Sequence, residues 1–195
     1  MQRPDLPFDA PLEVLETPRL LLRVDTAAVY MHLYKTATDD ELKSYFGIVA
    51  DEELQTQKAK VIGGMTTHRT SILFFHLIEK AQHIIVGSFA FHNWYPMHRR
   101  SEIGYTVSAA EHKNKGFMKE AFPHMINYGF ERMDLNRIEA FIHPENGPSR
   151  RLVEGVGFQR QGLLKEHYFN DGKMGDSIVY GMLRDDYRHL CLQRT

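Results

Sequence analysis

The stretch EIGYTV at residues 102–107, followed by KNKGFM at residues 113–118, decides the fold of this chain. It has the pattern of a strand that feeds a short polar loop, and the loop opens a helix whose apolar residues recur at spacings of three and four. A helix N-terminus leaves backbone N–H groups unpaired and carries partial positive charge, so it can bind a phosphate. Gly116 lets the backbone approach a ligand, and Lys113 and Lys115 add charge. A polar loop that merely caps a helix is the competing interpretation.

A second polar cluster, NGPSRR at residues 146–151, follows a strand-like run at residues 137–142 and precedes a short helical segment. The order of strand, cationic glycine loop, long helix, strand, Asn-x-x-Ser and short helix resembles the GNAT N-acetyltransferases, and in particular their RimJ/RimL-like branch. The resemblance runs from ETPRL at residues 16–20 to about Tyr187. Its most specific motifs are EIGY at 102–105, KGFxxEA at 115–121, Asn146-x-x-Ser149 and Gly157-Phe158.

The resemblance implies an α/β fold of the GNAT type, in which a mixed, mostly antiparallel central sheet is flanked by helices in a single domain. Local patterns agree with this fold. Strands are predicted at residues 19–24, 71–79, 84–91 and 102–107, and a terminal hairpin at 161–169 and 177–183 around the turn NDG at 170–172. Helices are predicted within residues 26–35 and 51–69, and from Gly116 onward with Pro123 inside the helix.

Composition favours one domain, because 195 residues with 43% hydrophobic content can bury a substantial core. We expect an extended arm at residues 1–16, the acetyltransferase domain at 17–188 and a tail at 189–195. A net charge of -1 argues against a nucleic-acid partner, and no apolar run approaches the roughly 20 residues that span a membrane. The lone Cys191 excludes an internal disulfide. A cytoplasmic protein is therefore expected, and the sequence leaves a homodimer open.

The resemblance implies that acetyl-CoA is the co-substrate. Its pyrophosphate would be bound mainly by backbone N–H groups of the loop Lys113, Asn114, Lys115, Gly116, Phe117 and Met118. Met118 stands where the family pattern Gln/Arg-x-x-Gly-x-Gly/Ala has a small residue, which puts close approach at that position in doubt. The pantetheine arm would pair like an extra strand with the main chain of Thr106, Val107 and Ser108. Asn146 would bond a pantetheine amide.

Glu102 is the candidate general base, because an attacking ammonium must lose a proton and a carboxylate can accept it directly or through water. Its place before the cofactor loop matches the catalytic glutamate of several GNAT enzymes. An ion pair with Arg99, Arg100 or another surface cation is the alternative. The backbone N–H of Val107 or its neighbour is the candidate donor to the oxyanion.

Ser149 is the candidate proton donor to the departing thiolate, since the tyrosine that many GNAT enzymes use is replaced by Val153. Capping of the short helix by Asn146 and Ser149 is an alternative that does not exclude this role. A glutamate that is common in the branch, and that could be an alternative base, is replaced by Gln161. This replacement favours Glu102 as the general base.

The 11 histidines do not form a metal motif, so no metal is expected. The loop from His92 to His98 leads into Glu102 and is expected to line the acceptor side. Together these features predict direct acetyl transfer from acetyl-CoA to a primary amine, with a protein N-terminus such as that of a ribosomal protein as the acceptor. A small amine (polyamine, amino acid or aminoglycoside) and a non-catalytic CoA-binding sensor are the alternatives.

Overall fold

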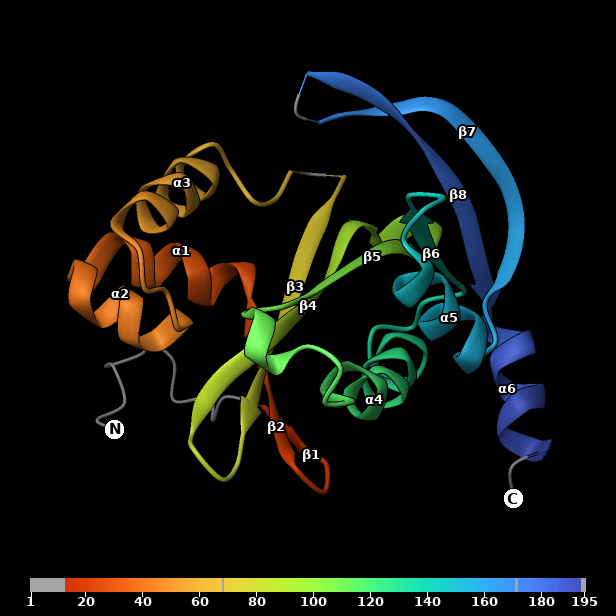
Figure 1. The fold of residues 1–195 in the computed structure, drawn as a ribbon, viewed down its shortest axis with the longest axis horizontal. Coiled ribbons are helices and arrows are strands. Elements are labelled where there is room, and N and C mark those ends of the chain that lie inside the picture. Colours follow the sequence, from red (N-terminus) through yellow and green to blue (C-terminus); the bar gives the residue numbers. More distant parts are fainter. Residues whose placement is uncertain (1–12, 68, 171, 194–195) are drawn as a thin grey trace.

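Eight strands form one sheet in the order β1-β2-β3-β4-β5-β6-β8-β7, in a computed structural model that describes residues 13–67, 69–170 and 172–193. Neighbouring strands are antiparallel except β5 and β6, which are parallel. The strands are β1 (Val14–Glu16), β2 (Leu20–Thr26), β3 (Ser71–Glu79), β4 (Ile84–Tyr95), β5 (Arg100–Val107), β6 (Arg137–Ile142), β7 (Gln159–Asn170) and β8 (Lys173–Leu183). The predicted meander and terminal hairpin are therefore present, and the hairpin rises above the rest of the sheet (Figure 1).

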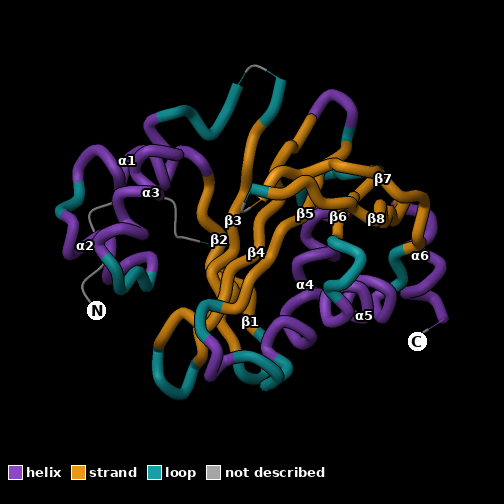
Figure 2. Tube along the Cα trace, turned by 45° about the horizontal axis from the view of Figure 1, so that its top comes forward, coloured by secondary structure: helices purple, strands orange, loops and turns teal. Residues whose placement is uncertain are grey.

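Helices cover both faces of this sheet (Figure 2). They are α1 (Ala27–Thr36), α2 (Asp39–Phe46), α3 (Asp51–Ile62), α4 (Phe117–Glu131), α5 (Gly147–Val156) and α6 (Arg184–Gln193). Successive side chains of β3 point to opposite faces of the sheet, because side chains alternate along a strand. Phe75 and Leu77 belong to the main core with α4, whereas Phe74 packs against the small core of α1 to α3. Among the described residues, no helix is long and apolar enough to cross a membrane.

The long helix α4 buries the stripe that the sequence predicted, with Phe117, Ala121, Phe122, Met125, Ile126, Gly129 and Phe130 inside the core. It packs under β2, β3 and β4. Pro123 lies on the exposed side of this helix, where water can take the hydrogen bond that its ring removes. The helix therefore continues through the proline without losing its apolar face.

Two helices, α2 and α6, were not expected from the sequence. Helix α2 begins with a capping box of Thr38 and Glu41 and ends at Gly47, whose φ of 69° is left-handed. Helix α3, which spans Asp51–Ile62, lies within the predicted range 51–69. Helix α6 runs through residue 188, where we placed the end of the domain, and its Leu190 packs against Gly157.

The N-terminal arm is described from residue 13 onward. Residues 14–16 of this arm form β1 and pair with β2. The expectation for residues 1–12 lies outside the described residues.

The close approach of α4 to β4 depends on Gly129, because a Cβ there would stand 2.6 Å from Cζ of the fully buried Phe91. Gly129→Ala gains about 1 kcal/mol of helix propensity but overpacks the core, which typically costs about 1–3 kcal/mol. We expect a net loss of unfolding free energy in denaturant titrations. Gly155→Ala in α5 is the control, because nothing lies within 4 Å of its Cβ, and it should be neutral or stabilising. Equal stability of the two variants would contradict this account of the packing.

Candidate functional site

The sheet opens between its two parallel strands. Of the residues that the structure describes, three pairs join β5 to β6, namely Arg100 with Arg137, Ser101 with Ile138 and Glu102 with Glu139. Strand β5 then continues to Val107 alongside β4, while β6 continues to Ile142 alongside β8. The two strands therefore form a V with the Glu102–Glu139 pair at its vertex. The backbone along the inner edge of the V is left for a ligand to pair with.

Hydrogen bonds to β4 establish which backbone groups face this opening. The N–H of Ser108 donates to the carbonyl of Val86 at 3.0 Å. Because such bonds alternate along an antiparallel pair, the N–H and C=O of Thr106 also face β4, whereas those of Tyr105 and Val107 face the opening. Of the three residues expected to hold a pantetheine arm, Val107 thus presents its backbone to the gap.

The loop after β5 ends at a helix N-terminus without a side-chain cap. Gly116 is the residue before α4 and has φ 79° and ψ 8°, a left-handed conformation that glycine adopts without strain. The first-turn N–H groups of α4 are therefore available to an anion. Lys113, Asn114 and Lys115 are exposed beside them, whereas the side chain of Met118 is 8% exposed and lies in the core. The bulk of Met118 consequently does not stand over the loop.

Glu102 lies at the vertex of the V and is 7% exposed. Its Oε2 accepts a hydrogen bond from Nδ2 of Asn93 at 2.9 Å, and its Oε1 accepts one from the hydroxyl of Tyr168 at 3.3 Å. Nε2 of His92 lies 3.6 Å from Oε1. Gly104 leaves room for this ring, because a Cβ there would be 3.1 Å from Nε2. The carboxylate is thus held by neutral donors in a nearly buried place.

Neither arginine named in the alternative role for Glu102 pairs with it. Arg99 pairs with Asp134 at 2.8 Å, and Arg100 pairs with Glu139 at 3.0 Å. Both arginines that precede Glu102 in the sequence are therefore engaged elsewhere.

Asn93 and Tyr168 were not found from the sequence. Asn93 lies in an irregular part of β4, where the register with β5 shifts between His92 and Tyr95, and its φ is 44°. Tyr168 follows a register shift in β7, where the N–H of Glu166 bonds Oδ1 of Asp176 at 2.9 Å. Asn93 belongs to the segment from His92 to His98, which was expected to line the acceptor side. Burial, followed by the charge and hydrogen bond of Glu102, raises the pKa of Tyr168, so this hydroxyl stays protonated.

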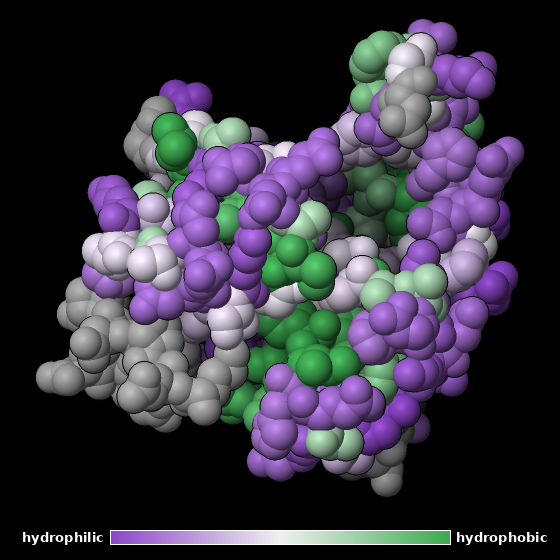
Figure 3. Space-filling model, turned by 60° about the vertical axis from the view of Figure 1, so that its left-hand side comes forward, coloured by the Kyte–Doolittle hydropathy of each residue, from purple (hydrophilic) through white to green (hydrophobic). Residues whose placement is uncertain are grey.

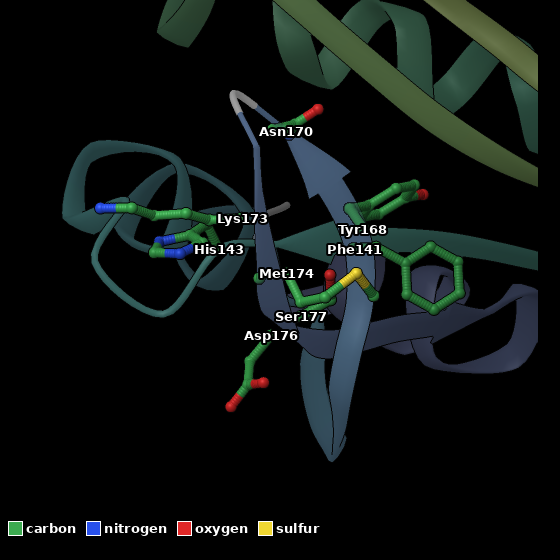
Figure 4. A pocket seen from close by; sticks show the side chains of 9 residues that line it. Phe141, His143, Tyr168, Asn170, Lys173, Met174, Asp176 and Ser177 are labelled. Carbon is green, nitrogen blue, oxygen red and sulfur yellow. The ribbon is translucent and has the colours of Figure 1, made fainter.

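A cavity of about 380 Å³ lies next to Tyr168, between the end of β6 and the β7–β8 hairpin (Figure 4). Its lining residues are Phe141, His143, Tyr168, Asn170, Lys173, Met174, Gly175, Asp176 and Ser177. Figure 3 shows that one face of the molecule is hollowed and that hydrophobic side chains lie at the bottom of the hollow. Since Tyr168 both lines the cavity and contacts Glu102, a molecule bound there would lie close to the carboxylate.

Helix α5 borders the V on the β6 side. Oδ1 of Asn146 accepts a hydrogen bond from the N–H of Ser149 at 3.1 Å, so Asn146 caps this helix. The hydroxyl of Tyr105 donates to the carbonyl of Ser149 at 3.4 Å and links α5 to β5. Val153 is buried in the core, and Gln161 accepts a hydrogen bond from Arg137. Of these positions, Asn146 and Ser149 lie at the start of α5, where Tyr105 of β5 contacts the backbone of Ser149.

No group of three or more His, Cys, Asp or Glu side chains is arranged to hold a metal ion in the part of the chain that the structure describes.

Comparison with known proteins places this geometry among acetyltransferases. A sequence profile described as "Acetyltransferase (GNAT) domain" matches residues 19–159. The uncharacterized N-acetyltransferase p20 of Bacillus licheniformis is 30% identical over 181 residues, which cover 90% of this chain and 99% of that relative. A crystal structure of an acetyltransferase (GNAT family) from Bacillus anthracis matches with a TM-score of 0.62 and 27% identity, over 89% of this chain and 99% of that one.

Two further relatives have names that specify an acceptor. The putative ribosomal N-acetyltransferase YdaF of Bacillus subtilis is 30% identical over 103 residues, covering 53% of this chain and 56% of that relative. The spermidine N(1)-acetyltransferase of Vibrio cholerae is 29% identical over 111 residues, covering 57% and 64%. The two identities are nearly equal, so they do not distinguish between a protein and a polyamine acceptor.

The cap on α5 can be tested through stability. Asn146→Ala removes the acceptor for the Ser149 N–H and should lower the free energy of unfolding by about 1 kcal/mol. Asn146→Ser should restore most of this loss. Ser149→Ala is the matched control, because Ser149 contributes its backbone N–H to the cap and keeps it in this variant. Chemical denaturation would measure all three, and an unchanged Asn146→Ala variant would contradict the cap.

Proposed function

Since this chain belongs to the GNAT family and is an N-acetyltransferase, we propose that it moves the acetyl group of acetyl-CoA directly to a protein N-terminal α-amine. The family resemblance and the α/β fold predicted from the sequence are both confirmed by the comparisons. The observation that carries the proposal is the V between β5 and β6, which joins an uncapped helix N-terminus at one end to Glu102 at the other.

The residues present fit a long, phosphate-bearing thioester. The N–H groups at the start of α4 suit its diphosphate, with Lys113 and Lys115 adding charge. The unpaired backbone of Tyr105 and Val107 suits an extended arm that carries amide groups. Asn146 keeps its side-chain amide N–H groups for such an arm while its oxygen caps α5. When bound, acetyl-CoA would supply the activated acyl group.

The protein's own part in the reaction begins with Glu102, which accepts the proton that the attacking amine must lose. The donors Asn93 and Tyr168 fix the orientation of this carboxylate. The N–H of Val107 faces the opening and can donate to the carbonyl oxygen as negative charge develops there, a contribution of about 2.7–4 kcal/mol in comparable sites. We assign the proton that the departing thiolate takes up to the hydroxyl of Ser149, a residue in the first turn of α5.

The charges around Glu102 support a protein N-terminus over a polyamine. The neighbouring Glu139 is already paired with both Arg100 and Arg137, at 3.0 and 2.8 Å. Asp176 in the cavity accepts a hydrogen bond from the Glu166 N–H. At the vertex of the V an amine therefore meets one carboxylate, Glu102, that lacks an arginine partner, whereas a second cationic centre placed beside Glu139 would approach two arginines.

The role of Glu102 is tested with Glu102→Gln, which keeps the size and the contact with Asn93 but removes the base. We expect kcat to fall by about 10²–10⁴-fold and its pH profile to change, because general base catalysis contributes that much. The affinity for CoA in calorimetry should not change. Glu111→Gln, on the exposed surface before the loop, is the matched control and should leave kcat unchanged. An unchanged kcat in Glu102→Gln would remove this residue from the mechanism.

The acceptor is tested by measuring thiol release from acetyl-CoA with a panel of amines. The panel holds peptides with free α-amines, the same peptides with blocked α-amines but a free lysine, and spermidine. We expect turnover with free α-amines and at most slow turnover with the other two. Preference for spermidine would establish the polyamine alternative. CoA binding without thiol release from any amine would indicate the sensor instead.

A further inference from the structure

Three groups from the β1–β2 turn converge on Glu120, in the first turn of α4. The hydroxyl of Thr17 donates to Oε1 at 2.6 Å, and the backbone N–H of Arg19 donates to the same oxygen at 2.8 Å. Nε of Arg19 donates to Oε2 at 2.6 Å and forms an ion pair. The turn at the start of β2 is therefore bound directly to the helix that follows the cofactor loop.

Arg19 also reaches the loop itself. Its Nη1 donates to the carbonyl of Lys115 at 3.0 Å. Its guanidinium lies 4.9 Å from the ring centroid of Phe117, and its Nη2 would be 3.5 Å from a Cβ placed on Gly116. One side chain thus contacts Lys115 and Phe117 and lies beside Gly116 between them.

The position of Glu120 explains why a positive charge is needed beside it when an anion binds at the start of α4. A carboxylate in the first turn of a helix interacts favourably with the helix dipole, but it repels an anion that binds the same N-terminus. Burial would raise the pKa of Glu120, yet the hydrogen bonds from Thr17 and Arg19 and the charge of Arg19 outweigh it, so the pKa is lowered and the group is ionised. Its side chain is 16% exposed, against 48% for Arg19, so the cation lies on the solvent side of the pair.

We propose that Arg19 is a positioning residue for the diphosphate of CoA. It holds the backbone from Lys115 to Phe117 in the conformation that presents the N–H groups, and it cancels the negative charge of Glu120 beside them. This inference rests on the proposed function, because it assumes that the loop binds the diphosphate. It assigns a role in cofactor affinity to a residue that lies 96 positions before Lys115 in the sequence.

The test is calorimetric titration with CoA, combined with steady-state kinetics. Arg19→Ala should raise the Kd for CoA and the KM for acetyl-CoA by about tenfold or more, because a charge-assisted hydrogen bond is lost and a negative charge is uncovered. The kcat at saturating acetyl-CoA and the KM for the amine should change little. Adding Glu120→Gln to Arg19→Ala should recover part of the affinity, since the uncovered charge is gone. A purely structural arginine would show no such rescue.

Arg132→Ala is the matched control. Arg132 also ties the N-terminal segment to α4, through Glu13 at 2.8 Å, but at the other end of the helix. It should affect stability without affecting CoA affinity. Should Arg19→Ala fold poorly, Arg19→Lys keeps the charge beside Glu120 but cannot bridge to Lys115, and its affinity should be intermediate.

A failure of this inference can be distinguished from a failure of the proposed function. Unchanged CoA affinity in Arg19→Ala and Arg19→Lys, with tight binding by the wild type, would overturn this inference alone. Absence of CoA binding by the wild type would overturn the proposed function.

Discussion

The separation of β5 from β6 is the constraint on which the rest of the structure depends. The strands pair for three residues and then belong to different neighbours, because β6 is paired along its full length with β8 while β5 stays with β4. A strand edge without a partner exposes backbone groups that favour pairing with another chain or a ligand. In this fold the edge lies inside the molecule, between two halves of one sheet, where an extended ligand can complete it.

Helix α4 couples this opening to the loop that ends at Gly116. The apolar face of α4 packs against β2, β3 and β4, and Phe122 contacts the rings of both Phe89 and Tyr105. Tyr105 in turn bonds the carbonyl of Ser149 at the start of α5. The N-terminus of α4 and the start of α5 are therefore both held relative to β5 by the same side chains. Packing in the core thus decides how a thioester would lie between its diphosphate and the vertex of the V.

The sequence predicted the parts of the molecule that are encoded locally. The spacing of apolar residues predicted α4, the strand-length apolar runs predicted β3 to β5, and Asn146 was correctly suspected of capping α5. Helix α2 was missed although Thr38 and Glu41 form its capping box, because eight mostly polar residues show little apolar periodicity. Asn93 and Tyr168 reach Glu102 through shifts of strand register, which no short motif records. The partnership of Arg19 and Glu120 joins two recognisable motifs, but only the tertiary structure shows that they touch.

The two glutamates at the vertex show how position alone gives neighbouring carboxylates different partners. Glu102 and Glu139 are directly opposite each other in the parallel register and so share one face of the sheet. Glu139 forms ion pairs with Arg100 and Arg137. Glu102 instead accepts hydrogen bonds from Asn93 and Tyr168, which carry no positive charge. The arginines that pair with Glu139 also reduce its repulsion of Glu102, which helps to accommodate a nearly buried carboxylate beside the opening.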